Sequence, residues 1–405
     1  MTKFTKLAFQ FCLGLTTSVV SHSALAATID KDISTRLDTL EKENAALRAR
    51  INRLEAPKTA KTEHRPALTS KRSPQADIFA ANASRVVAVR RSNSPRFEIS
   101  GSLLFLKPGA GNLEYGTLTS PLPAVSPSWE NQSLTPSYSP AFSVGARYIA
   151  NASNDIALNW THLNTTANAS FVATPTQMAG PPFLIGPESG LYKSGHGTVQ
   201  TKYDSVNLDA GHTFCADCQF QLRAFGGVGF ARIGQDLTGI FQSPDGAASM
   251  ASTTHSMFTG AGPRLGMKGQ YAIGDFEFIG EVAGAALIGT EQSRINFTTV
   301  APALAGPNNQ FLKSPDATRV IPSIDARLAT AYVFPASNYG QFKVEAGYRA
   351  AVYFDAVSQY ALTQVPTGLT LPPTGVYLAT AEHLRSNFTA HGPYLTASWL
   401  FGQGN

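Results

Sequence analysis

One alternating pattern constrains this chain more than any other feature. From Arg96 to Phe401 it repeats short runs in which apolar residues alternate with polar or very small ones, separated by turns. The run from Phe342 to Val352 is the clearest, with charged residues and glycine between the apolar positions. Successive side chains of a strand point to opposite faces, so this run predicts a strand with one apolar and one charged face. The strands of a soluble β-sandwich would show the same alternation. However, many long segments that follow an export signal favour a membrane β-barrel, which is apolar outside and wet inside.

The first residues have the features of an export signal. Lys3 and Lys6 precede a mostly apolar stretch over Leu7–Val20, and Ala24-Leu25-Ala26 forms a small-residue cleavage site. We expect residues 1–26 to be a signal peptide; the alternative is a short amphipathic helix of the mature protein. Cleavage would remove Cys12 and leave two cysteines in an oxidising compartment.

Charge is distributed unevenly along the chain. Residues 1–96 carry 17 Lys and Arg against 8 Asp and Glu, whereas residues 97–405 carry 15 against 19. The alternating region is therefore mildly acidic and lacks the concentrated basic face that nucleic-acid binding needs. No apolar run reaches the roughly 20 residues of a spanning helix. We expect neither a nucleic-acid partner nor a helical membrane anchor.

Residues 28–56 predict a helix with a heptad repeat. Their apolar positions step alternately by four and three residues, the rhythm of a coiled coil, with one amide at an a position that would fix register. These positions are Ile33, Leu37, Leu40, Asn44, Leu47, Ile51 and Leu54. We interpret the segment as a short periplasmic coiled coil that makes the protein a homo-oligomer. A single amphipathic helix lying on another surface is the alternative.

Residues 57–95 predict a linker, because Pro57, Pro66 and Pro74 interrupt a stretch of little periodicity. Its scattered Lys and Arg could contact anionic cell-wall polymer. A solvated tether is the preferred interpretation.

Residues 96–405 predict a transmembrane antiparallel β-barrel of roughly ten strands, with eight to twelve as the range. Four connections are short and five are long and polar, which is how outer-membrane barrels distinguish their periplasmic side from their outer side. An even strand number places both termini in the periplasm. Leu237–Phe241 and Phe311–Lys313 could extend these strands or add to them. The predicted fold is thus all-β, preceded by an α-helical coiled coil.

Charged residues of the inward parity are candidates for the pore lining, since charges of both signs keep a lumen hydrated and set ion preference. They are Arg147, Asp209, Arg223, Arg264, Lys268, Glu277, Glu281, Asp325, Arg327, Lys343, Glu345 and Arg349. The alternative is that these side chains pair across strands and fill a narrow barrel. An open or partly open pore is preferred.

Cys215 and Cys218 lie in a tight turn between two predicted strands. A disulfide that locks this hairpin is the preferred interpretation, followed by intermolecular pairing. Redox catalysis is the least favoured, because thioredoxin-like surroundings are lacking.

No other motif points to chemistry. The glycine-rich run Gly260–Gly266 lacks the Lys-Ser/Thr of a phosphate loop, and small lumen-facing residues explain it better. The histidines show no metal-ligand spacing, and no nucleophile motif is present. We expect no catalytic residues, no metal, no cofactor and no enzymatic activity.

Several segments, in order, resemble the Legionella-type major outer membrane protein family of pore-forming proteins. They are Leu103–Pro108 with Leu113-Glu114-Tyr115, Phe225-Gly226-Gly227 with Ala231-Arg232-Ile233, Gly260–Gly266, Val320-Ile321-Pro322 and Val344-Glu345-Ala346-Gly347-Tyr348. The resemblance spans roughly residues 96–401. It implies a β-barrel in the outer membrane of a Gram-negative bacterium, in contact with its lipid, with porin-like function. A non-conducting structural protein or surface adhesin is the alternative function.

Overall fold

The computed structural model describes Lys42 and residues 95–120, 128–182, 192–215, 219–300, 306–334, 340–364 and 380–401. The chain divides into two compact units, Met1–Ala76 and Asp77–Asn405. In the first unit only Lys42 is described, and it is helical and exposed. The predicted signal peptide, coiled coil and linker otherwise lie outside the described residues and stay predictions.

The described part of the second unit consists of β-strands and their connections. The strands are β1 (Arg96–Ala110), β2 (Glu114–Thr119), β3 (Trp129–Ser133), β4 (Ser139–Ile149), β5 (Asn154–Val172), β6 (Ala179–Gly180), β7 (Ser194–Phe214), β8 (Phe220–Gln242), β9 (Ser249–Ile273), β10 (Phe276–Val300), β11 (Asn308–Lys313), β12 (Ala317–Val333), β13 (Gln341–Gln364) and β14 (Thr380–Phe401). Within these ranges no helix is long and apolar enough to cross a membrane.

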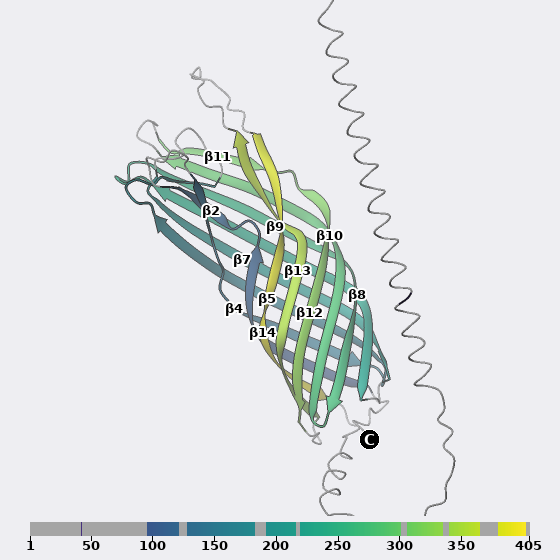
Figure 1. The fold of residues 1–405 in the computed structure, drawn as a ribbon. Helices are drawn as coiled ribbons and strands as arrows, with labels where there is room; N and C mark the ends of the chain where they lie inside the picture. The colour runs from purple at the N-terminus through teal and green to yellow at the C-terminus, as the bar shows by residue number, and fades with distance from the viewer. Residues whose placement is uncertain are drawn as a thin grey trace, which may run out of the picture. The chain divides into compact units, whose positions relative to one another are not determined.

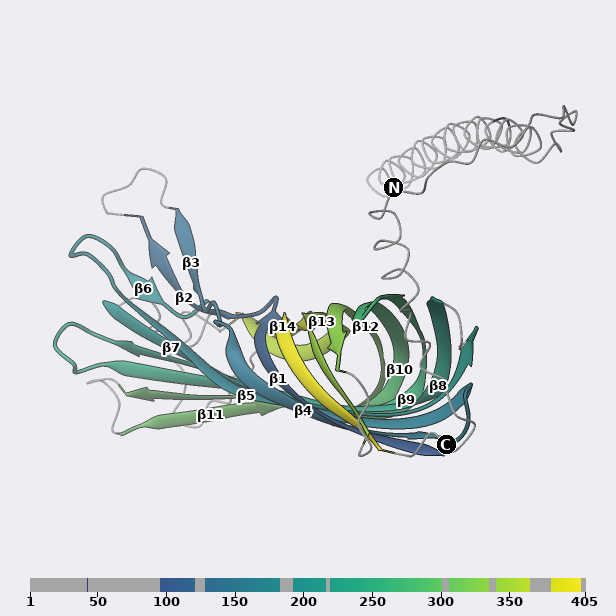
Figure 2. The ribbon, with the colours of Figure 1, turned by 90° about the horizontal axis from the view of Figure 1, so that it is seen from below.

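Ten of these strands close into an antiparallel ring. Around it the order is β10-β12-β13-β14-β1-β4-β5-β7-β8-β9, and β9 pairs with β10 to complete the circle. The first and last strands are neighbours, with Phe97 opposite Phe401. Figure 1 shows the strands running obliquely side by side, and in Figure 2 the wall can be followed from β5 through β4, β1, β14 and β13 to β12. Closure leaves no bare sheet edge in the wall, as a lipid-embedded sheet requires.

The connections confirm the predicted contrast between the two ends of the barrel, except that β8 and β9 are joined by only the six residues 243–248, where a long connection was predicted. The end that holds Arg96 and Phe401 carries the short connections 150–153, 215–219, 274–275 and 334–340, and is called the short-turn end below. At the opposite end the longer connections contain β2, β3, β6 and β11. Two segments left open by the sequence are resolved here: Leu237–Phe241 extends β8, and Phe311–Lys313 belongs to β11, which pairs with β10.

Outward side chains near the short-turn end form an apolar belt, which reaches from the short turns up to Phe105, Trp160, Phe230, Ile288 and Val320. Large apolar residues are exposed throughout it, and Leu265 and Leu328 have 71% and 72% of their surface uncovered. Exposed apolar surface of this extent is unfavourable in water but matches the outer wall of a membrane barrel. The belt defines the membrane-spanning part of the strands.

The strands continue far beyond this belt at the long-loop end. β9 and β10 have 25 residues each, whereas a tilted strand needs only about 9–11 to cross the hydrocarbon. Past Ile288 the outward residues of β10 are polar: Thr290, Gln292, Arg294 and Asn296. On the inner face of this outer part, the small sheet β3-β2-β6 packs through Tyr115. The ring of Tyr115 lies directly over Gly197 of β7, where a Cβ atom would come within 2.3 Å of it.

Candidate functional site

Within the apolar belt, the inward positions of the strands carry charge. They surround a cavity of about 170 Å³ inside the barrel. Eleven of the twelve predicted pore-lining residues line it: Arg147, Asp209, Arg223, Arg264, Lys268, Glu281, Asp325, Arg327, Lys343, Glu345 and Arg349. The twelfth, Glu277, is 3.8 Å from the Lys343 ammonium. The structure thus brings the predicted set together in one lumen; whether the lumen conducts stays a prediction.

Asp155 joins two strands of the wall. Its carboxylate accepts hydrogen bonds from Arg147 Nη2 at 2.7 Å and from Arg223 Nε at 2.9 Å. The Asp155 side chain is only 2% exposed, and charge-assisted bonds of this kind are stronger than neutral ones. Gly211 makes room for the second contact, because a Cβ atom there would meet the Arg223 guanidinium. Asp155 therefore fixes both guanidiniums at the short-turn end.

The remaining carboxylates of the lumen also have partners. Arg327 Nε donates to Glu281 at 3.0 Å, and Arg349 Nη2 donates to Asp325 at 2.6 Å. Arg264 Nη1 donates to Asp209, and the Tyr394 hydroxyl donates to Glu345. Glu98 lies 3.6 Å from Arg147. The charged groups thus form a nearly continuous ring of pairs around the lumen.

Lys268 is the exception in this ring. Its ammonium faces the cavity and makes neither an ion pair within 4.0 Å nor a hydrogen bond with any residue that the structure describes. Between the short-turn end and the apolar layer, which is defined below, the inward side chains that the structure describes include eight cations and seven carboxylates. This part of the lumen therefore has an excess of one positive charge. The cations are Arg96, Arg147, Arg223, Arg264, Lys268, Arg327, Lys343 and Arg349; the carboxylates are Glu98, Asp155, Asp209, Glu277, Glu281, Asp325 and Glu345.

Several polar atoms of this ring are buried without a hydrogen-bond partner among the residues that the structure describes. They include Arg147 Nε, Asp209 Oδ1 and Glu277 Oε2. Buried polar groups are costly when unsatisfied and usually bond to ordered water. The chemistry of the lumen therefore fits a hydrated chamber.

Sequence reasoning missed three members of the ring: Glu98, Asp155 and Tyr394. Glu98 and Asp155 occupy the inward parity of β1 and β5, so the alternation could have found both. The alternation of the last strand also places Tyr394 inward, but only the fold shows that its hydroxyl bonds to Glu345.

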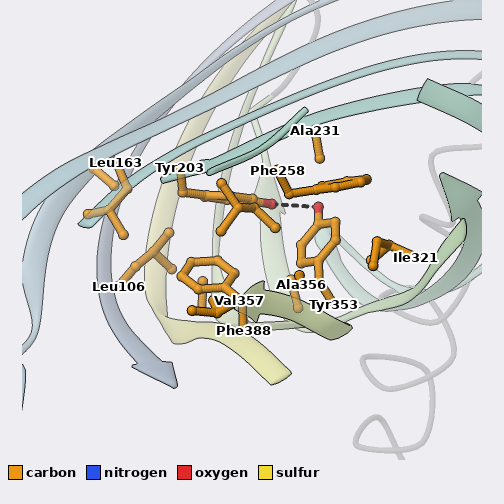
Figure 3. Close-up of a cluster of buried hydrophobic side chains, with 14 of the residues drawn as sticks. Leu106, Leu163, Tyr203, Ala231, Phe258, Ile321, Tyr353, Ala356, Val357 and Phe388 are labelled. Atoms are coloured by element: carbon orange, nitrogen blue, oxygen red, sulfur yellow. Dashed lines mark hydrogen bonds between the residues drawn. The ribbon is translucent and has the colours of Figure 1, made fainter. Parts of the chain in front are cut away.

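Above the charged ring the interior is apolar. Side chains from all parts of the wall pack into one buried cluster, which we call the apolar layer. It contains Leu104, Leu106, Leu163, Tyr203, Ile233, Phe258, Leu287, Ile321, Tyr353, Ala356, Val357 and Phe388, with several alanines. Figure 3 shows the rings of Tyr203, Phe258, Tyr353 and Phe388 meeting in this cluster. The sequence did not predict this layer, which fills the interior at the outer border of the belt.

An irregularity in β13 places two of these residues inside the barrel. Tyr353 pairs with Phe388 and Val357 with Ser386, so four residues of β13 advance against two of β14. Asp355 has a positive φ of 55° in this bulge, and its N–H donates to Asn387 Oδ1 at 3.0 Å. Bulges bend a strand strongly. Beyond it, the described segments 356–364 and 380–386, called the inner hairpin below, cross the interior.

Contacts with β9 and β10, which lie three and two positions from β13 in the ring, show that the hairpin turns inward past β12. In the ring the neighbours of β13 are β12 and β14. The inner hairpin nevertheless bonds to β9 and β10: Ser358 N–H donates to Ser256 Oγ at 2.9 Å, and Ser293 Oγ donates to the Ser358 carbonyl at 3.2 Å. Ser358 is fully buried.

A charge cluster anchors the same hairpin outside the membrane-spanning part. Glu291 of β10 is 4% exposed, and its carboxylate lies 3.3 Å from Arg319 Nε, 3.4 Å from His383 Nε2 and 3.8 Å from Arg385 Nε. The two arginine contacts are at ion-pair distances, although neither carboxylate oxygen has a hydrogen bond of good geometry to a described residue. The ring of His383 stacks on Tyr360 at 4.6 Å.

Ser358, His383 and Glu291 superficially suggest a hydrolytic triad, but their geometry argues against one. Arg385 Nη2 donates to His383 Nδ1 at 2.9 Å. Burial, and then the charge of Arg385, lower the pKa of His383, which keeps the ring neutral. Nδ1 is therefore the acceptor and Nε2 carries the proton, 2.6 Å from Ser358 Oγ. A triad needs the opposite, a free Nε2 as base and the carboxylate at Nδ1.

Two further predictions concern groups outside the lumen. Cys215 is disulfide-bonded and has a φ of 50°. Cys218 lies outside the described residues, so the Cys215–Cys218 pairing stays a prediction. Within the described residues, His, Cys, Asp and Glu form no group that could hold a metal ion.

A closed antiparallel ring with an apolar outer belt and a charged interior defines an outer-membrane β-barrel. Residues 91–401 match the family described as Legionella pneumophila major outer membrane protein precursor. The chain belongs to this family, as the sequence resemblance implied, and its place is the outer membrane. No curated protein matches.

Solved outer-membrane proteins are distantly similar in fold. The outer membrane protease OmpT from Escherichia coli has 10% identity and a TM-score of 0.36, covering 76% of this chain and 96% of its own. The outer membrane protein OprG from Pseudomonas aeruginosa has 10% identity and a TM-score of 0.26, covering 78% and 99%. The translocator domain of the autotransporter NalP from Neisseria meningitidis has 11% identity and a TM-score of 0.23, covering 80% and 95%. At this level none indicates an activity for this chain.

Proposed function

We propose that this protein is a pore-forming protein of the outer membrane, through which ions and small hydrophilic solutes diffuse passively. The observation that supports this function best is the ring of paired charges around a cavity, inside a barrel whose outer belt is apolar. Charged rings of this kind set the ion preference of channels. The short-turn end would face the periplasm, as it does in outer-membrane barrels.

Reconstitution into planar lipid bilayers tests the proposal. Purified, folded protein should give discrete, ohmic conductance steps. The heat-modifiable migration of a folded barrel in electrophoresis serves as the folding control. A preparation that passes this control and stays silent would rule out the pore.

A non-conducting structural protein is the second candidate, and the apolar layer is the observation that favours it. Leu106, Tyr203, Phe258 and Phe388 fill the interior, and apolar constrictions exclude water and ions. Under this proposal the charged ring would only stabilise the wall. The bilayer experiment separates the two functions, since a structural barrel would carry no current even after the layer is perturbed.

Two properties accompany the proposed function. The heptad at residues 28–56 would hold several barrels together, which cross-linking of the full chain and of a variant lacking residues 28–56 can test. The protein would act without enzymatic chemistry, in keeping with the tautomer of His383, which leaves Ser358 without a base.

A further inference from the structure

We infer that the inner hairpin, segments 356–364 and 380–386, is the gate of this barrel, and that Glu291 of β10 is its anchor on the wall. This inference rests on the proposed function. Three neighbouring features support it: the β13 bulge, the apolar layer and the charge cluster around Glu291.

Part of the apolar layer belongs to the inner hairpin. This part can move out of the interior without breaking the strand pairing of the barrel wall. Most of the layer belongs to strands paired on both sides along the ring. Ala356 and Val357 differ, because they follow the bulge, past which β13 pairs only with β14. The pairing of β12 with β13 ends at Tyr353, opposite Ser323. A hinge at this point could swing the hairpin outward while all ten strands stay closed.

The contacts that hold the hairpin inward are apolar as well as polar: Val357 packs in the apolar layer, and Tyr360 packs against a second buried cluster that includes Phe241 and Ile295. Two backbone groups of Ser358 bond to serine hydroxyls of β9 and β10, at 2.9 and 3.2 Å. Glu291 attracts the Arg385 guanidinium of the hairpin and lies 3.4 Å from Nε2 of the neutral His383 ring. A neutral hydrogen bond contributes little net stability in a protein, because water replaces it on opening. These polar contacts can therefore be lost at modest cost, and the apolar contacts of Val357 and Tyr360 make up the rest of the cost of opening.

Glu291 also has an alternative partner when the hairpin leaves. Arg319 belongs to β12, opposite Gly289 of β10, and stays 3.3 Å from the carboxylate. The buried acid would thus not be left without a cation in the open state. His383 and Arg385 would become exposed to water, where charged and polar groups are well solvated.

The covalent test locks the hairpin. A variant with Ser256→Cys and Ser358→Cys places one thiol at the position of Ser256 Oγ, 2.9 Å from the Ser358 backbone nitrogen, and the other on the side chain of residue 358 itself. Oxidation, verified by mass spectrometry, should lower the open probability in planar bilayers by roughly tenfold or more, because the open state is removed from the equilibrium. Dithiothreitol should restore it. Each single variant and the unaltered protein, with and without dithiothreitol, are the controls.

The complementary tests favour the open state. Deleting residues 357–386 and bridging the gap with a short Gly-Ser turn should increase the open probability and the mean conductance. Glu291→Gln should also raise the open probability, by severalfold, whereas Glu382→Gln should not. Glu382 is exposed on the same hairpin and makes no ion pair among the described residues, so it is a matched control.

The outcomes separate the gate from the pore. A conducting protein whose verified cross-link and whose deletion both leave the current unchanged would refute the gate and leave the pore intact. A silent protein that conducts after the deletion supports the gate. If the unaltered protein and the deletion variant are both folded and silent, the pore and its gate are both wrong.

Discussion

Tyr203 and Tyr353 share a hydrogen bond of 3.0 Å across the interior of the barrel. Their strands, β7 and β13, lie five positions apart in either direction around the ten-stranded ring. Both rings are nearly fully buried, and their centroids are 5.7 Å apart with an interplanar angle of 64°. Figure 3 shows this bond as the dashed line at the centre of the apolar layer. Opposite walls thus meet through two side chains.

The first prediction concerns this bond. Tyr203→Phe should lower the free energy of unfolding by about 1 kcal/mol, since it removes one buried hydrogen bond while keeping the ring. Combining it with Tyr353→Phe should cost less than the sum of the single variants, because the two residues share one interaction. Urea unfolding in lipid vesicles measures all three. Strict additivity would show that the bond contributes nothing.

The second prediction concerns Asp155. Asp155→Asn should lower the free energy of unfolding by about 3 kcal/mol, because it leaves the buried Arg147 and Arg223 guanidiniums without their carboxylate. Asp275→Asn is the control, since Asp275 lies exposed in the turn between β9 and β10. The same urea titration should show little change for this control. Equal losses for both variants would contradict the role of the buried ring.

Ion selectivity provides the third prediction. Arg264→Glu and Arg349→Glu should each move selectivity toward cations, because each changes the described inward charge from an excess of one positive to an excess of one negative. The reversal potential in a salt gradient measures the shift. Arg232→Glu is the control, because Arg232 is exposed on the outer face of β8 beyond the apolar belt. A shift of the same size in this control would mean that the lumen does not set selectivity.

The fourth prediction tests the lipid-facing belt. Val228→Arg should cost about 2–4 kcal/mol, the range for a cation at the midplane of a barrel wall, because Val228 is 53% exposed within the belt. Asn296→Arg should be tolerated, since Asn296 faces outward on β10 past the end of the belt. Assembly into outer-membrane fractions and urea unfolding distinguish the two. If both are tolerated, the belt does not mark the membrane.

The fifth prediction concerns the cysteine turn. Cys215→Ser and Cys218→Ser should each abolish the mobility change that reductant causes in electrophoresis, without changing oligomer size. Oligomers that dissociate only with reductant would instead indicate intermolecular pairing. A Cys215–Cys218 disulfide would close only a very short loop, so its loss should destabilise the barrel little.

Much of the lumen was predictable because strand geometry is local. Side chains alternate between the two faces of a strand, so their face can be predicted wherever a strand forms. Lys343, Glu345 and Arg349 could therefore be placed in the interior from the sequence. The same rule applies to Glu98 and Asp155, which were overlooked. The ion pairs could not be predicted in the same way. The partners of Arg349 and Arg264 lie on other strands, so they depend on the strand register.

The outer half of the barrel shows where periodicity fails. Val357 and Ser358 are both buried, so the alternation breaks after the bulge at Asp355. A bulge changes which face each later residue occupies, and no local pattern around Phe354–Ala356 announces it. The inward turn of the hairpin, and with it the apolar layer, could therefore not be predicted.

By itself, the sequence determined the architecture. Alternation from Arg96 to Phe401 set an apolar outside and a charged inside, and the lengths of the connections distinguished the two ends. Only the tertiary structure decided what fills the interior. Leu106, Tyr203 and Phe258 have the same inward parity as the charged residues nearer the short turns, but meet Phe388 and Val357 because β13 bends across the ring. Contacts between opposite walls depend on ring closure and on one bulge. Neither can be recognised from the residues adjacent in the sequence.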